Sequence, residues 1–434
     1  MAHTNFHLAP PAKVVDGLTA VPIDIQSIDG TLVFDGATSA AEADITIEFI
    51  AGTTDGCPVF DLRQTITEAW LDGATLTLAQ IAHHDFGGGP NAELRIIEVP
   101  VVAGSVHALR VRYALGPPQA SSAGSYPPNL AWNAGPRLVF NFGFTDLGAG
   151  RYLEAWVPCN LTFDQFALSV EITVTNTAID HSVITNATVT TLGINHWQLE
   201  WPPTITALSS LLEIRATDSL EHVSGSVSLP VSGTNVTIDV WKLSGGPANL
   251  ATQLTNIQGF LADNENEVGP YLHGNRFVAF FNVGGMEYDG GTTTGTSALR
   301  HEVFHSWWGR GLKPALPRDG WWDEAWTVYK VAGGTGSVPL DFTDPPASLS
   351  TLNPWSRITP STSYTRGREL FEGLAALSGT VSLNQWMYDF YAAHGGSLAT
   401  TETMEEWLLQ RSGDDDVVDA FHRFVYGFEE PASV

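Results

Sequence analysis

The sequence predicts an α+β protein of two domains, with an all-β domain over residues 1–200 and a mixed domain over residues 201–434. Three observations lead to this prediction. The chain has 434 residues, 43% of them hydrophobic, which is enough for two or three cores at ~100–200 residues per domain. Apolar and polar side chains alternate in the first domain, as in half-buried strands. After Ser297 the apolar side chains recur at helical spacing instead.

The expected strands of the first domain each bury one face. Apolar and polar residues alternate in three clear runs, at 45–49, 109–113 and 166–174. A period of two places all apolar side chains of a run on the same side of the strand. Pairs such as Asp72-Gly73 separate the runs and predict turns, and the stretch 117–128, rich in Gly, Ser and Pro, predicts a surface loop. Several such strands predict a sheet or sandwich.

The second domain is expected to begin with strands and to end in helices. Strands are predicted at 236–241 and 276–283, and helices around 370–377, 383–391 and 404–408. Ser382 and Gln385 predict a capping box for the second of these helices. The acidic run 414–416 predicts the start of the last helix, because negative charge suits a helix N-terminus. A calcium site at this run is a weaker alternative.

The charge balance limits the expected partners. The formal net charge is −27, because only 20 Lys and Arg residues stand against 47 Asp and Glu residues. Such a surface repels phosphate backbones and anionic lipids, so we expect neither nucleic acid nor a membrane as a partner. It favours cationic ligands, such as a free amino terminus. Adaptation for solubility or salt is the other explanation of the same charge.

The cysteines and the N-terminal residues indicate in which cellular compartment the protein is expected. Two cysteines, Cys57 and Cys159, are too few for a cysteine-based zinc site, and the sequence does not decide whether they pair. The first residues lack the charged and apolar regions of a signal peptide, and no apolar run approaches the ~18 residues of a membrane span. We therefore expect a cytoplasmic protein, although the mature form of a secreted protein would look the same. The sequence does not indicate the oligomeric state.

Residues 301–305 read HEVFH and fit the pattern H-E-x-x-H, within a predicted helical segment at 297–308. Positions i and i+4 of a helix lie on one face, ~5–6 Å apart at Cβ. His301 and His305 can therefore bind one Zn²⁺ together, at ~2.0–2.1 Å. Glu302 lies beside them and is the candidate general base for a water molecule at the metal.

A catalytic zinc site needs a third protein ligand and one open position. Glu324 follows His305 after 18 residues, within the segment WWDEAWT, and a helix that starts near Asp319 would bring it to the metal. The alternative is that both histidines are ordinary helix residues. That alternative must explain two His and two Glu in an apolar, Trp-rich stretch, where unpaired charges are costly. The sequence therefore predicts one zinc ion bound by two histidines and Glu324.

Four segments of this chain resemble motifs of the M1 family of zinc aminopeptidases, which are gluzincins. HEVFHSWWG at 301–309 resembles the family's HExxHxWxG, and WWDEAWT at 321–327 resembles its glutamate-bearing helix. GGMEY at 284–288 resembles G-x-M-E-N, and YTRG at 364–367 resembles the start of the helix with the catalytic tyrosine. WVPC at 156–159 is similar to a segment of the family's β saddle. The resemblance implies a β saddle followed by a thermolysin-like domain.

The resemblance also implies roles for individual residues. Glu287 would bind the α-ammonium group of a peptide substrate, and Gly284 and Gly285 would offer backbone groups to its extended chain. Tyr364 would donate a hydrogen bond to the developing oxyanion. Together with Glu302 as general base, these roles imply an aminopeptidase that removes N-terminal residues.

The sequence also departs from the family pattern. The chain ends soon after the predicted catalytic helices, so we expect a compact form without the family's C-terminal helical domain and with a more open cleft. Asp323 and Tyr288 stand where the family has asparagines. Asp146 and Glu154 are the candidates for a second amine-binding residue in the β domain. Two alternatives stay open: a zinc endopeptidase or specialised peptide hydrolase, and a non-catalytic binding protein on a peptidase fold.

Overall fold

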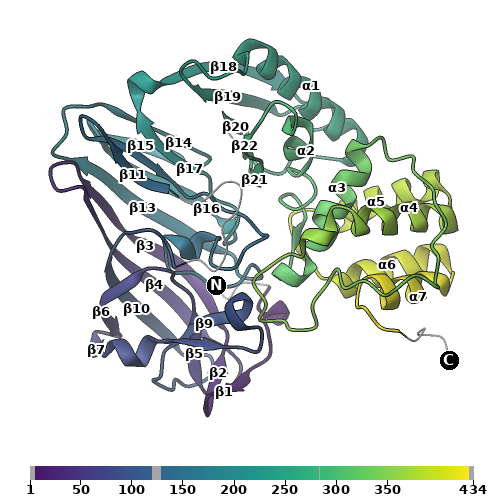
Figure 1. The fold of residues 1–434 in the computed structure, drawn as a ribbon, viewed down its shortest axis with the longest axis horizontal. Helices are drawn as coiled ribbons and strands as arrows, with labels where there is room; N and C mark the ends of the chain where they lie inside the picture. Colours follow the sequence, from purple (N-terminus) through teal and green to yellow (C-terminus); the bar gives the residue numbers. More distant parts are fainter. Residues whose placement is uncertain (1–4, 120–128, 283, 430–434) are drawn as a thin grey trace. The chain divides into compact units, whose positions relative to one another are not determined.

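The computed structural model describes residues 5–119, 129–282 and 284–429, and the chain forms two compact units. The first unit runs through His222 and also takes in Trp241–Pro247. The second contains Val223–Val240, Ala248–Phe281 and the described residues from Gly285 onward. Strands dominate the first unit, whereas the second combines a sheet with helices (Figure 1). The predicted order, a β-rich region followed by a mixed α/β region, is confirmed.

An eight-stranded sheet is the largest element of the first unit. Its strands, in spatial order, are β15 (Thr188–Gly193), β16 (His196–Ile205), β13 (Phe166–Thr175), β3 (Ile23–Asp35), β4 (Ala40–Ala51), β10 (Val106–Ala114), β6 (Thr65–Leu71) and β7 (Ala74–Leu76). The three predicted alternating runs lie in β4, β10 and β13, and every second residue of β13 is buried. Asp72 and Gly73, both with positive φ, form the two-residue turn between β6 and β7.

Two smaller sheets complete the first unit. One consists of β1 (Lys13–Val15), β2 (Leu18–Val21), β5 (Cys57–Phe60), β9 (Glu93–Ile96) and β8 (His83–Asp85). The other consists of β11 (Asn129–Asn133), β12 (Arg137–Asn141), β17 (Leu212–Ala216) and β14 (His181–Thr185). Cys57 and Cys159 are both buried, and no disulfide joins them. Of the predicted loop at 117–128, residues 120–128 lie outside the described part of the chain.

The second unit contains most of a five-stranded sheet, with a helix following the second of its strands in the chain, and ends in helices (Figure 1). The strands, in spatial order, are β18 (Leu220–Ser228), β19 (Asn235–Leu243), β20 (Arg276–Phe281), β22 (Gly291–Thr294) and β21 (Met286–Tyr288). The helices are α1 (Leu250–Val268), α2 (Leu299–Phe304), α3 (Trp321–Val331), α4 (Arg366–Ser378), α5 (Thr380–His394), α6 (Thr401–Ser412) and α7 (Asp416–Phe424). The predicted strands and helices of this region are present, although Val283 lies outside the described residues.

Tryptophans form the centre of the core of the second unit. Five of them have no exposed surface: Trp307, Trp308, Trp321, Trp322 and Trp326. The ring of Trp308 lies within 6.3 Å of Trp322 and Trp326 on α3 and of Phe390 on α5. Each buried aromatic side chain removes a large apolar area from water and contributes about 2–3 kcal/mol. This packing holds α2 and α3 against each other, so residues on these two helices keep a fixed separation.

Two predictions about helix ends are wrong. The helix predicted at 297–308 is shorter, because α2 ends at Phe304 and the chain turns tightly up to Gly309, whose φ is +98°. The capping box of Ser382 and Gln385 does not form, because α5 already begins at Thr380, directly after Gly379 with φ of +82°. The start of the last helix is confirmed at Asp416. Among the residues described, no helix has the length and apolar character that crossing a membrane requires.

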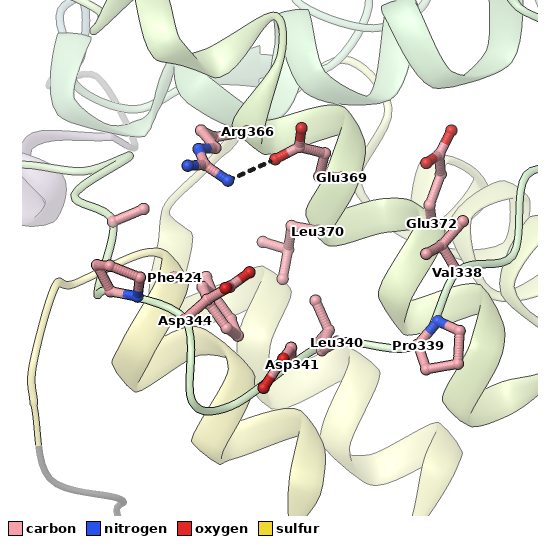
Figure 2. Close-up of a pocket in the computed structure, with 12 residues that line it drawn as sticks. Val338, Pro339, Leu340, Asp341, Asp344, Arg366, Glu369, Leu370, Glu372 and Phe424 are labelled. Carbon is pink, nitrogen blue, oxygen red and sulfur yellow. Dashed lines mark hydrogen bonds and ion pairs between the residues drawn. The ribbon is translucent and has the colours of Figure 1, made fainter.

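A pocket of about 390 Å³ lies where the segment after α3 runs along α4 and α7 (Figure 2). Leu340, Leu370 and Phe424 supply its apolar side chains, and Arg366 pairs with Glu369 at 3.0 Å (Figure 2). None of the predicted metal ligands lines it. The pocket is therefore separate from the residues described next.

Candidate metal centre

His301 and His305 share one face at the end of α2. His305 caps this helix but keeps helical backbone angles, with φ −59° and ψ −18°. The two rings are therefore one turn apart, with centroids 4.6 Å from each other and Nε2 atoms 3.0 Å apart. The short helix is sufficient to bring the two nitrogens together, as the H-E-x-x-H spacing predicts.

Glu324 brings a third ligand atom to the same place from the first turn of α3. Its Oε2 lies 3.2 Å from Nε2 of His301 and 3.5 Å from Nε2 of His305. Tetrahedral ligands at ~2.0–2.1 Å from zinc are about 3.3–3.4 Å from one another. The three atoms therefore form a triangle of the size that one zinc ion requires.

The carboxylate of Glu324 gives a second indication that a cation belongs here. Its Oε2 is buried and receives no hydrogen bond from the described residues, which is costly for a carboxylate oxygen. Burial alone would raise the pKa of Glu324, but the imidazoles of His305 and His301 hold it well below its usual range. The residues at this site thus fit a divalent cation in donor type, in spacing and in charge.

Asp323 orients His305 from the side opposite the metal position. Its Oδ1 lies 2.6 Å from Nδ1 of His305, which also approaches the backbone oxygen of Trp308 at 3.1 Å. A hydrogen bond at Nδ1 leaves Nε2 as the free, metal-binding nitrogen. Burial raises the pKa of Asp323 to about 6, although His305 acts in the opposite direction. Sequence reasoning treated Asp323 only as a departure from the family pattern; its place directly before Glu324 was the available signal.

Glu302 lies buried beside the ligands, and Gly285 makes room for it. A Cβ atom at position 285 would lie 2.2 Å from Oε1 and 2.9 Å from Cδ of Glu302, which is closer than real Cβ contacts occur. Burial raises the pKa of the Glu302 carboxyl well above its usual range, and the charge of Glu287 adds to this effect. Gly285 therefore has a packing role toward the candidate base, in addition to the backbone role that the sequence suggested.

Glu287, the expected amine ligand, lies on β21 close to the metal ligands. One ligand atom each of Glu287, His305 and Asp323 lies within 4.8 Å of the others. Its Oε1 accepts a hydrogen bond of 2.5 Å from Nη2 of Arg310, and both side chains are buried. Sequence reasoning missed Arg310. A lone arginine directly after the H-E-x-x-H helix, in an apolar stretch, was the signal that it must have a buried partner.

Tyr364 reaches the same group of residues from the chain just before α4. Its hydroxyl donates a 2.7 Å hydrogen bond to Oε1 of Glu324. Its ring lies almost parallel to that of His301, with centroids 6.3 Å apart. The structure thus places the predicted tyrosine beside Glu324, although the two are 40 residues apart in the chain.

Gly284, Glu154 and Asp146 are the remaining candidates from the sequence. Gly284 has a φ of +84°, which favours glycine. In the first unit, Glu154 is buried, and its carboxylate oxygens approach the backbone N–H of Tyr152 at 3.3 Å and the sulfur of Cys159 at 3.6 Å. The backbone oxygen of Asp146 lies 3.5 Å from the hydroxyl of Tyr152. The second amine-binding residue stays a prediction.

A β-rich unit followed by a mixed α/β unit is the architecture of two-domain zinc metallopeptidases of the M1 type. Solved structures agree over nearly the whole chain. A crystal structure of an M1 zinc metallopeptidase mutant from Deinococcus radiodurans, bound to a Tyr-Ser-Ala substrate, is 17% identical with a TM-score of 0.65, covering 94% of this chain and 95% of that one. A two-domain M1 zinc metallopeptidase bound to L-tryptophan is 16% identical with a TM-score of 0.63, covering 98% and 99%.

A third structure is an aminopeptidase A from Legionella pneumophila in complex with aspartic acid. It is 12% identical with a TM-score of 0.67, and the match covers 96% of this chain but 51% of that protein. No family model matches the sequence, and no curated protein matches it significantly. The chain therefore has the fold of two-domain M1 zinc metallopeptidases, and the fold implied by the sequence resemblance is confirmed.

Proposed function

We propose that this protein is a zinc-dependent aminopeptidase that removes N-terminal residues from peptides. The observation that carries the proposal is the triangle of His301 Nε2, His305 Nε2 and Glu324 Oε2, with Glu302 beside it. These three side chains would hold one zinc ion, which polarises a scissile carbonyl and lowers the pKa of water to ~7. The other residues of the site supply the proton transfer and the orientation.

Each of the protein groups has a defined task in this reaction. Glu302 takes the proton of the attacking water and passes it to the leaving amine. Tyr364 shifts its hydrogen bond from Glu324 to the oxygen on which charge develops. Asp323 keeps His305 in the metal-binding tautomer. The Trp-rich core behind α2 and α3 fixes these groups, so that little reorganisation is needed during the reaction.

The charge of the site supports a substrate with a free amino terminus. Four buried carboxylates, those of Glu287, Glu302, Asp323 and Glu324, meet the charge of Arg310 and of one divalent cation. When the bound cation keeps all four carboxylates ionised, one negative charge is left in excess, and the α-ammonium group of a peptide balances it. A blocked amino terminus carries no positive charge and does not balance it. The Tyr-Ser-Ala substrate in the Deinococcus structure supports a peptide as the substrate class.

Three measurements test the proposal. The purified protein is expected to contain about one zinc per chain, and to cleave a tripeptide with a free amino terminus but not its N-acetylated form. Glu302→Gln is expected to keep the zinc and to lose activity by about 10²–10⁴-fold. Equal cleavage of the blocked peptide would point to the endopeptidase alternative, and a protein without bound zinc or peptidase activity would be the non-catalytic alternative.

A further inference from the structure

Arg310 is a buried cation to which the proposed reaction assigns no individual task. It follows Gly309 in the turn after α2, and its side chain is 4% exposed. The guanidinium reaches Glu287 twice: Nη2 donates to Oε1 at 2.5 Å, and Nε donates to the backbone oxygen at 3.2 Å. One planar group therefore holds both the main chain and the carboxylate of the same residue.

The guanidinium is itself held in place. Its Nη1 donates to the backbone oxygen of Gly309 at 2.7 Å and lies 3.9 Å from Oδ2 of Asp323. The backbone N–H of Arg310 donates to the oxygen of His305 at 3.0 Å. The position of Glu287 is thus tied, through Arg310, to the turn that carries the second histidine.

We propose that Arg310 is a positioning residue that fixes Glu287 for the recognition of a free amino terminus. The inference rests on the proposed aminopeptidase function and adds a determinant of its specificity. Arg310 donates a hydrogen bond to Oε1 of Glu287. Oε2 is the atom left to accept from the α-ammonium group. A single acceptor at a fixed place selects for a primary amine at one distance from the metal, and so for cleavage after the first residue.

Two effects oppose each other when Arg310 is removed. The charge of Glu287 is no longer compensated, which strengthens its attraction for a cation at long range. However, Glu302 and Asp323 both experience the charge of Glu287, and without Arg310 their repulsion turns the carboxylate away. The contact with the ammonium group is a short hydrogen bond, so the placement of Oε2 has the larger effect.

The test uses the zinc-loaded protein and a tripeptide in free and N-acetylated form. In an E302Q background, which prevents turnover, Arg310→Met is expected to weaken the binding of the free tripeptide by about tenfold in calorimetry, as expected for a displaced contact. Weak binding of the acetylated form is expected to stay unchanged. With Glu302 intact, KM for the free tripeptide rises by the same factor, while kcat changes by less than about threefold. A merely structural role would reduce kcat, zinc content and both affinities together.

Lys313 supplies a matched control, because it is another buried cation of the same loop. Its Nζ pairs with Asp289 at 2.5 Å. Lys313→Met is expected to keep the preference for the free tripeptide. Arg310→Lys is a milder variant for the case that Arg310→Met loses zinc or fails to fold. It keeps the charge but cannot hold both groups of Glu287, and an intermediate loss of affinity is expected.

The outcomes separate the two proposals. If the unmodified protein binds and cleaves both tripeptides equally, the aminopeptidase function itself fails. If it prefers the free tripeptide, and Arg310→Met or Arg310→Lys keeps that preference at full strength with normal zinc content, the role of Arg310 is refuted. A selective loss that appears in the Arg310 variants and not in Lys313→Met supports it.

Discussion

The contact between Gly285 and Glu302 gives the sharpest prediction from the structure. Gly285→Ala adds a single methyl group, and the three atoms nearest to it all belong to Glu302. The added carbon would lie 2.2 Å from Oε1 of Glu302, whereas ordinary contacts begin at 3.4 Å. The carboxylate must therefore move by roughly 1 Å, and a displacement of this size at a reacting group costs about 10²-fold in rate. We expect kcat/KM of Gly285→Ala to fall by about that factor.

The assay compares Gly285→Ala with Gly295→Ala. Both positions have negative φ values, and a Cβ at Gly295 meets no atom within 4 Å, so this control tests the cost of the substitution itself. We measure kcat/KM on a free tripeptide, zinc content and thermal stability for both variants. Gly285→Ala should retain its zinc, because His301, His305 and Glu324 are not displaced.

The result that refutes the reasoning is equally definite. A general base that is displaced cannot retain its efficiency. If Gly285→Ala keeps more than about half of the activity, Glu302 is therefore not the general base. Loss of zinc together with activity would also contradict it, because the three atoms nearest to the added methyl group all belong to Glu302.

Three further predictions concern Asp323 and Tyr364 at the site and the buried Asp319. Asp323→Ala should weaken zinc binding by about 10–100-fold, because His305 loses its hydrogen bond, and Asp323→Asn should weaken it less. Competition with a chelator measures both affinities. Affinities equal to that of the unmodified protein would contradict the role of Asp323. Tyr364→Phe should lower kcat by about 10²–10³-fold with zinc retained, and an unchanged kcat would exclude the hydroxyl. Burial raises the pKa of Asp319 from 3.8 to about 6. Its contribution to stability is therefore complete below pH 3.8 and is lost as the pH rises through 6. Between pH 4.5 and 7.5, the free energy of unfolding of the metal-free unmodified protein should fall by about 2 kcal/mol relative to that of Asp319→Asn, measured by chemical denaturation. A difference between the two proteins that does not change with pH would contradict the raised pKa of Asp319.

The meeting of His301, His305 and Glu324 could be predicted because their positions depend on local geometry. His301 and His305 are one helical turn apart in any helix, and the 18-residue spacing to Glu324 spans one turn and the start of a second helix. The strands were predictable for the same reason, since alternation is a local property. Ser382 shows the limit of this reasoning, because a local capping signal was overridden by the position at which Gly379 turns the chain.

The residues that support the ligands were not predictable in this way. The pairs Glu287–Arg310 and His305–Asp323 join segments on different elements. Their contacts depend on how the chain turns after Phe304, where the helix ends earlier than its pattern indicates. The sequence shows that such buried charges need partners, but it does not show which charge faces which.

Two glycines illustrate how the site accommodates its carboxylates. A Cβ at Gly285 would meet Glu302, and a Cβ at Gly309 would lie 2.0 Å from Oδ2 of Asp323. Neither carboxylate belongs to the triangle of His301, His305 and Glu324, yet each approaches the main chain so closely that no side chain fits there. Gly309 also has a φ of +98°, so both its conformation and its neighbour require glycine. The candidate base Glu302 and Asp323, which approaches His305, are therefore accommodated by the absence of side chains opposite them. For that reason the glycines next to the Glu287 and H-E-x-x-H segments are as much part of the site as the acids they accommodate.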